Sequence, residues 1–301
     1  MTAGTQAGAQ AGAGPRAGGR WRLLAIDSAT ERLALAAAAW SGRPDEPFEI
    51  HALDLPGGPA ASATALPELQ GLLARLGWAL ADLDAVAFGA GPGGFTGLRT
   101  ACAVAQGLAW GLGCPVVPVD SLALVAEDAV APGAPALVPA GPGLHVRVAM
   151  DARMGEVYTG AYQRRADGCW AVIDAPQLCA PAQLNERLSA MPPDLLAGSA
   201  WVAFEGQLAT AGRPCVTAER SRAHALAVLA LRGLVVGRTV PAELALPVYL
   251  RDKVAQTTVE REAIKAAKAL AAAQAEADAG VGVGAGAGAG AGAGHGPREP
   301  A

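Results

Sequence analysis

Two short polar turns, each directly after a buried strand, are the residues of this 301-residue chain best placed for phosphate or metal chemistry. The first turn is Asp27-Ser28-Ala29-Thr30, and the second runs from Asp151 to Gly155. Backbone N–H groups and small hydroxyls in such turns can hold phosphates, and an aspartate can orient a metal-bound water. The same residue types also simply complete the hydrogen bonds of a turn. The pattern occurs at equivalent places in two similar halves, so both interpretations stay open.

The most distinctive local sequence is Gly91-Pro92-Gly93-Gly94-Phe95-Thr96-Gly97-Leu98-Arg99. Glycine lets the backbone approach other groups closely, and Thr96 is expected to cap the helix that follows. The N–H groups at a helix N-terminus attract anions. These features would suit a phosphate, although the Gly-Lys-Ser/Thr ending of a P-loop is absent.

Residues for covalent or metal-dependent catalysis are poorly arranged. The four histidines stand alone, with no pair at helical i, i+4 spacing to bind a metal, and no serine has a nucleophile-elbow context. The five cysteines form no C-x-x-C pair and predict neither a zinc site nor a disulfide framework. The sequence therefore predicts no catalytic residue and no metal ligand set in this chain.

The hydrophobic pattern predicts the elements that would position these turns, in two similar halves. In the first half we expect strands and helices at 22–27, 33–40, 48–55, 65–78 (helix), 83–88, 96–112 (helix), 115–119 and from 121 (helix). In the second half we expect them at 146–151, 156–162, 169–173, 181–190 (helix), 195–197 and 221–236 (helix). Each half reads β-β-β-α-β-α, which indicates an internally duplicated α/β fold.

This repeat predicts two lobes between two tails. The first lobe is expected at 21–131 and the second at 132–252, with helix 221–237 packing back toward the first. Residues 1–20 and 280–301 are low-complexity and are expected to be disordered, because they bury too little side chain to offset chain entropy. Residues 253–279 form an Ala-rich segment that could be helical on propensity.

The helix at 96–112 has a stripe of small and apolar residues that includes Ala101, Ala105 and Leu108. Small side chains let another element approach a helix closely. The stripe could therefore serve the protein's own core or a partner helix, and both interpretations stay open at this point.

Composition excludes several classes of protein. The chain is 52% hydrophobic by residue, but no stretch of about 18 apolar residues runs without a charge, Gly or Pro, so it is not expected to span a membrane. The net charge is −4, so no overall basic field points to nucleic acid. The N-terminus lacks the order of a signal peptide, and we expect a cytoplasmic protein with reduced cysteines.

Three segments together resemble a known family. They are Leu24–Thr30, Gly91–Arg99 and Met150–Tyr158, and their order and spacing are similar to those of the TsaB (YeaZ) family of bacterial tRNA threonylcarbamoyladenosine biosynthesis proteins, in the Gcp-like superfamily. The resemblance covers about residues 22–252. It implies a duplicated fold of the actin, sugar-kinase and Hsp70 type, with two lobes that each hold a mixed sheet and flanking helices.

The resemblance further implies a non-catalytic subunit that pairs with its paralogue TsaD and with the ATPase TsaE to modify adenosine 37 of tRNAs that read codons starting with A. ATP, ADP and metal would act at those partners, tRNA would be met through the complex, and no cofactor would be bound tightly here. Asp27, Ser28, Thr30, Asp151 and Gly155 would be the remnant of a nucleotide site. The interface would use helices 65–78 and 96–112, through Leu69, Leu73, Ala101, Ala105 and Leu108. A homodimer in the absence of TsaD stays open at the level of sequence.

Two other functions remain open at the level of sequence. An active ATP-dependent small-molecule kinase of the same fold would need an adenosine-binding Gly-Gly turn in the second half, where Gly198 stands alone. A glycoprotease-like metalloenzyme would need a histidine pair on the first-lobe helix, where this chain has Leu66, Leu69 and Leu72.

Overall fold

The computed structural model describes residues 14–16, 19–58 and 61–251. The expected tail and Ala-rich segment at 253–301, and most of the expected N-terminal tail, lie outside the described residues. Within the described residues, no helix has the length and apolar content needed to cross a membrane.

The first sheet has the strand order β3-β2-β1-β4-β5. Its strands are β1 (Trp21–Asp27), β2 (Arg32–Trp40), β3 (Glu49–Pro56), β4 (Ala85–Gly91) and β5 (Val116–Asp120). The chain meanders antiparallel through β1, β2 and β3, and then adds β4 and β5 parallel to β1. Parallel strands end at the same edge of a sheet, so this topology places Asp27 beside the end of β4, where the Gly-rich motif begins.

Helices cover both faces of this sheet because its central strands are apolar on both sides. Alternate residues of β1 contact α1 (Ala61–Leu76) and α2 (Phe95–Leu112) through Leu24 and Ile26. Leu23 and Ala25 contact α6 (Arg222–Val235) on the opposite face. Helix α6 comes from the second half of the chain, so the two halves are joined by a shared core.

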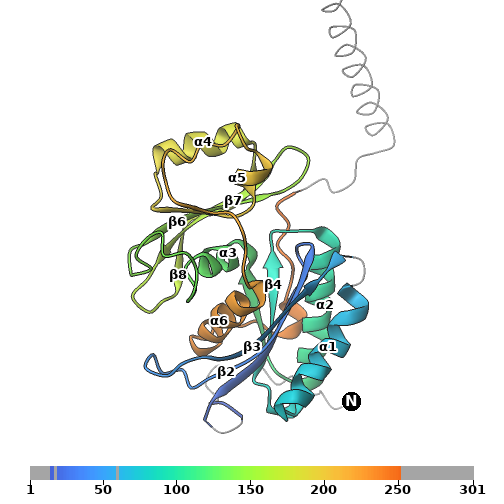
Figure 1. Cartoon of the computed structure of the whole chain (residues 1–301). Helices are drawn as coiled ribbons and strands as arrows, with labels where there is room; N and C mark the ends of the chain where they lie inside the picture. Colours follow the sequence, from blue (N-terminus) through green and yellow to red (C-terminus); the bar gives the residue numbers. More distant parts are fainter. Residues whose placement is uncertain (1–13, 17–18, 59–60, 252–301) are drawn as a thin grey trace, which may run out of the picture. The chain divides into compact units, whose positions relative to one another are not determined.

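The second sheet repeats the plan with the order β10-β9-β6-β7-β8. Its strands are β6 (His145–Asp151), β7 (Val157–Arg164), β8 (Trp170–Cys179), β9 (Leu195–Ala197) and β10 (Cys215–Val216). One face packs on α3 (Ser121–Ala129), and the other on α4 (Pro181–Ala190) and α5 (Ala200–Ala203). Figure 1 shows α3 and α6 in contact with each other between the two sheets.

The expected fold class is confirmed: two mixed sheets with flanking helices, each built from the same β-β-β-α-β-α order. Some bounds differ from the expectation. Helix α1 begins four residues earlier than expected, and β8 continues six residues beyond Ile173 as the outer strand of its sheet. Many residues of β8 are half-buried or exposed, so its second part lacks the continuous apolar run that would have predicted it.

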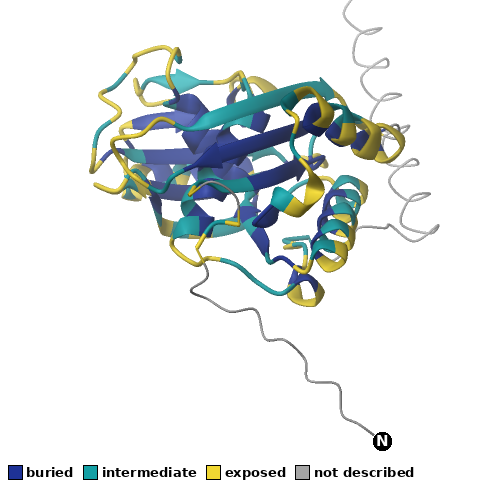
Figure 2. Ribbon diagram, turned by 90° about the horizontal axis from the view of Figure 1, so that it is seen from below, coloured by how far each residue is buried: buried dark blue, intermediate teal, exposed yellow. Residues whose placement is uncertain are grey.

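The small-residue stripe of α2 faces the protein's own sheet. Ala101 and Ala105 are fully buried in the core between α1, α2 and the first sheet, and Leu69 and Leu73 of α1 lie in the same core. These four residues are therefore not on the surface where a partner could touch them, and Leu108 is only half-buried against the same core. Figure 2 shows how the dark buried strands contrast with the exposed outer faces of the helices. Since a helix repeats every 3.6 residues, the exposed face of α2 carries Ala103, Gly107 and Trp110 instead.

We expect Ala105→Arg to destabilise the isolated protein by about 3 kcal/mol or more, because the substitution puts a large unpaired charge into a filled core. Chemical denaturation followed by circular dichroism would measure this. Ala103→Arg, two residues along the same helix but on its exposed face, is the matched control and should change stability by less than about 0.5 kcal/mol. Equal stability of the two variants would contradict the placement of Ala105 in the core.

Candidate functional site

The site predicted from the first turn is organised around the carboxylate of Asp27, which is completely buried at the end of β1. Its Oδ1 accepts a hydrogen bond of 2.7 Å from the N–H of Ala29, which closes the turn. Its Oδ2 accepts a hydrogen bond of 3.4 Å from the hydroxyl of Ser121, at the start of α3. There is no space beside it: a Cβ added to Gly89 of β4 would overlap this carboxylate.

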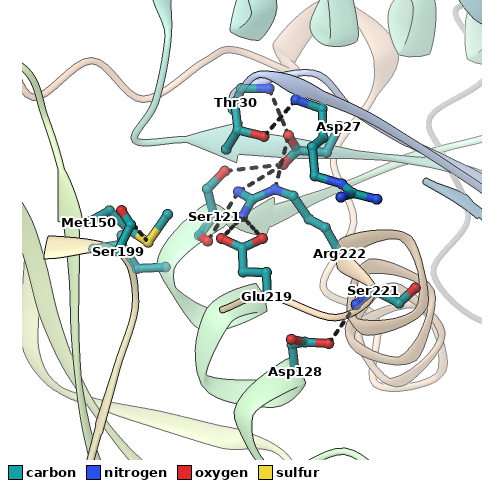
Figure 3. Close-up of polar contacts among 12 residues, drawn as sticks. Asp27, Thr30, Ser121, Asp128, Met150, Ser199, Glu219, Ser221 and Arg222 are labelled. Atoms are coloured by element: carbon teal, nitrogen blue, oxygen red, sulfur yellow. Dashed lines mark hydrogen bonds and ion pairs between the residues drawn. The ribbon is translucent and has the colours of Figure 1, made fainter. Parts of the chain in front are cut away.

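Arg222, the first residue of α6, completes the site as shown in Figure 3. Its Nε lies 3.4 Å from Oδ1 of Asp27, its Nη2 lies 3.4 Å from Oδ2, and its side chain is 2% exposed. Its Nη1 contacts both carboxylate oxygens of Glu219, at 3.1 and 3.0 Å. Burial by itself would lower the pKa of the guanidinium, but the charges of Asp27 and Glu219 outweigh burial and raise that pKa. Arg222 is therefore a buried cation between two carboxylates.

The Gly-rich motif packs tightly on the turn after β1. The N–H of Gly94 donates to the carbonyl of Ala29 at 2.7 Å, and the hydroxyl of Ser28 donates to the carbonyl of Gly97 at 2.8 Å. The N–H of Gly91 donates to the hydroxyl of Ser121 at 3.1 Å. A side chain at Gly93 would overlap Ala29, and one at Gly97 would overlap the carbonyl of Ser28. Gly93 and Gly97 thus serve close backbone packing, and the N–H groups of Gly91 and Gly94 are bonded to protein oxygens.

The expected capping role of Thr96 is wrong. Helix α2 begins at Phe95, its N-cap is Gly94, and no side chain caps it. Thr96 is exposed within the first turn, and its carbonyl accepts a bond from the Thr100 hydroxyl. Of the other motif residues, Pro92 and Leu98 are buried, and the guanidinium of Arg99 lies 3.8 Å from the centre of the Phe95 ring.

The second turn is built differently from the first. Asp151 is half-buried: its Oδ1 accepts a bond of 2.8 Å from the N–H of Arg153, and its own N–H donates to Ser199 at 3.2 Å. Gly155 has a φ of +77°, and Arg153 and Met154 before it also have positive φ. Such a run is rare for residues with side chains, so Gly155 is needed for the turn itself. In the first turn, Thr30 has the role that Asp151 has in the second. Its hydroxyl accepts a bond of 3.2 Å from the N–H two residues later, that of Arg32.

The structure brings the two predicted turns close together. Arg153 of the second turn forms an ion pair of 3.4 Å with Glu31, which directly follows the first turn. Both side chains are largely exposed, so this contact adds little stability but marks the proximity.

Sequence reasoning missed a segment that crosses this region, residues 245–251, which we call the strap. The N–H of Val248 donates to the carbonyl of Ala90 at 2.7 Å, and the Val248 carbonyl fills the space that a side chain at Gly91 would need. The Tyr249 ring lies 5.1 Å from that of Phe95. Arg251 pairs with Glu156 at 2.6 Å and donates to the carbonyl of Ala152 at 3.0 Å, both in the second turn region. The strap has neither helical nor strand periodicity, so no sequence signal marked it.

Several polar groups of the first turn and of the Gly-rich motif are engaged by the protein itself. Asp27 is paired with Arg222, and the N–H groups of Gly91 and Gly94 donate to protein oxygens. Among the residues that the structure describes, no group of three or more His, Cys, Asp or Glu side chains is placed to hold a metal. The alternative interpretation of the turns, that their polar residues complete backbone hydrogen bonds, accounts for the bonds of Asp27 with Ala29, of Asp151 with Arg153 and of Thr30 with Arg32, but not for the ion pair of Asp27 with Arg222.

Comparison with known proteins identifies the family. A protein of Escherichia coli (strain K12), named tRNA threonylcarbamoyladenosine biosynthesis protein TsaB, is 34% identical over 242 residues, which cover 78% of this chain and 96% of that protein. The chain belongs to the TsaB family. A TsaB of Haemophilus influenzae is 36% identical over 150 residues, which cover 46% of this chain and 58% of that protein.

A solved structure agrees with membership of the TsaB family. The structure titled YeaZ from Pseudomonas aeruginosa is 33% identical, covers 76% of this chain and all of that chain, and aligns with a TM-score of 0.61. Residues 60–193 match a family model described as TsaD: tRNA N6-adenosine threonylcarbamoyltransferase. The resemblance read from the three segments is thereby confirmed.

We expect Gly97→Ala to destabilise the protein by about 1–3 kcal/mol, because the added methyl group forces α2 away from the Ser28 carbonyl. Gly107→Ala, in the same helix with open space around it, is the control and should stabilise by about 0.5–1 kcal/mol on helix propensity. Urea denaturation of both variants measures the difference. Stabilisation by both substitutions would show that Gly97 does not need to be glycine.

Proposed function

We propose that this chain is a non-catalytic subunit that pairs with TsaD and, with the ATPase TsaE, supports formation of N6-threonylcarbamoyladenosine at position 37 of tRNAs. The observation that carries the proposal is the match to a named TsaB over nearly its whole length. The ion pair of Asp27 with Arg222 favours a non-catalytic role over a catalytic one. A kinase of this fold would need the Asp27 carboxylate free for metal and phosphate.

We further propose that nucleotide and metal act at the partner subunits and that this chain works in the cytoplasm. The net charge of −4 supports contact with tRNA through the complex, because a tRNA-binding surface of its own would favour excess positive charge. Self-association into a homodimer in the absence of TsaD belongs to the same proposal.

We place the partner surface on the solvent-exposed faces of α1 and α2. The interface residues predicted from the sequence lie on the opposite, sheet-facing side of the same two helices. Trp110 on α2 is 72% exposed, and Leu66 on α1 is 42% exposed. Large apolar groups of this kind supply much of the binding energy at protein interfaces. Ala103 and Gly107 on the same face of α2 would let a partner helix approach closely.

The proposal predicts that depletion of this protein lowers the cellular level of N6-threonylcarbamoyladenosine, measured by mass spectrometry of digested tRNA. Re-expression of the native chain should restore the modified nucleoside. Normal nucleoside levels after depletion would overturn the proposed function.

Ala103→Arg should abolish co-purification with TsaD while the melting temperature of the isolated chain stays unchanged, because the substitution adds bulk and charge only to the exposed face of α2. Val202→Arg is the matched control, since Val202 is 65% exposed on α5 of the other lobe. Retention of TsaD by Ala103→Arg, or its loss in Val202→Arg, would place the interface elsewhere.

A further inference from the structure

The buried carboxylate of Asp27 is neutralised by a residue of the chain itself, and the proposed function does not require this arrangement. A fully buried carboxylate needs a compensating positive charge, because transfer of an isolated ion out of water is very unfavourable. A bound cation is one way to supply that charge to a strand-ending aspartate. Here the compensating charge is covalently part of the chain, at Arg222.

The geometry points to one purpose for Arg222. Its guanidinium lies between Asp27 of the first lobe and Glu219, which is in the chain of the second half just before α6. Its Nη2 also donates to the carbonyl of Ser121, the first residue of α3, at 3.4 Å. One buried side chain thus connects β1 with the starts of both helices that lie between the two sheets.

The other groups that could attract an anion here are also used by the protein. The hydroxyl of Ser221 and the N–H of Ala223, at the start of α6, both donate to the carboxylate of Asp54 from β3, at 2.6 and 3.2 Å. The N–H groups of Arg220 and Ser221 donate to Asp128 of α3, at 2.8 and 3.0 Å. The N-terminus of α6 is therefore filled by two aspartates of this chain.

We propose that Arg222 is an internal counter-ion that takes the place of an external cation at Asp27 and so fixes the start of α6 against the end of β1 and the start of α3 without nucleotide or metal. The starts of α3 and α6, the two helices between the sheets, are then held together without a ligand, because Arg222 contacts both Asp27 and the Ser121 carbonyl. The strap reinforces the arrangement from outside, since Val248 is bonded to β4 and Arg251 to the turn of the second lobe.

The test uses the full chain with Mg²⁺ as the probe and the melting temperature as the readout. Native protein should melt at the same temperature with and without MgCl₂, compared with NaCl of equal ionic strength. Arg222→Ala should melt on the order of 10 °C lower, because it leaves Asp27 buried and unpaired. Mg²⁺, but not NaCl, should recover part of that loss, since the vacated space offers carboxylates to a cation that binds through one or two of them.

The double variant Asp27→Asn/Arg222→Ala is the matched control. It removes both charges, so it should melt above Arg222→Ala and should not respond to Mg²⁺. An Mg²⁺ response of the native protein that is lost in Asp27→Asn would overturn the proposal, as would equal melting of Arg222→Ala and the double variant without Mg²⁺. If Arg222→Ala does not fold, Arg222→Lys decides: a folded protein without an Mg²⁺ response supports an internal cation, and a response overturns it.

These measurements use the isolated chain, so they are independent of the proposed partner. Failure of the native chain to bind TsaD, or normal tRNA modification after its depletion, would refute the proposed function and leave the role of Arg222 standing.

Discussion

A carboxylate without access to water must find a positive charge, and in this protein that constraint joins the two ends of the fold. Asp27 lies at the end of β1, completely buried, and its ion-pair partner Arg222 begins α6, 195 residues later. The pair can form only if α6 leaves the second half of the chain and lies on the first sheet, which is where Leu226 and Leu231 pack. Hydrophobic burial fixes the face of α6, and the ion pair fixes how far along the sheet the helix begins.

The same logic governs α3, which comes from the first half and packs on the second sheet. Glu127 is buried on α3, where it pairs with Arg164 of β7 at 2.7 Å and with Arg232 of α6 at 3.2 Å, and also accepts a bond from the Trp170 ring nitrogen at 2.8 Å. Asp120, which caps α3, accepts a 2.6 Å hydrogen bond from Tyr162 of β7, and burial raises the pKa of its carboxyl above the ordinary value. Each sheet therefore has an apolar core, while the layer between the sheets is joined by paired buried charges, whose directional contacts specify one arrangement more sharply than apolar contact would.

The elements were predictable from sequence because each depends on neighbours in the chain. The apolar runs of β1 and β6 and the helical spacing of leucines in α1 are local signals, and the strand-ending aspartates predicted both turns.

The site was predictable only in part, because the contact that organises it, the ion pair of Asp27 with Arg222, is not local. Nothing in the sequence around Arg222 distinguishes it from the surface arginines nearby, and its partner can be known only once α6 is placed on the sheet. The strap was missed because it has neither helical nor strand periodicity and because its contacts, with β4 and the second turn, are far away in the chain. In α2 the small-residue pattern was noted correctly, but Ala101 and Ala105 suit a sheet as well as a partner helix, and only the fold decides that they face the sheet.

The Gly-rich motif can be understood without any ligand. Its glycines stand where the backbone of one segment touches that of another: Gly97 against Ser28, Gly93 against Ala29, and Gly91 against the strap at Val248. A side chain at Gly93 or Gly97 would separate the start of α2 from the turn after β1, and that turn holds Asp27 in contact with Arg222. A Gly-rich sequence that would suit a phosphate can thus be required by packing alone, since close backbone approach is what glycine offers in either case. The motif and the buried ion pair are then two parts of one construction, in which the glycines bring the backbones together and Arg222 neutralises the carboxylate that their contact encloses.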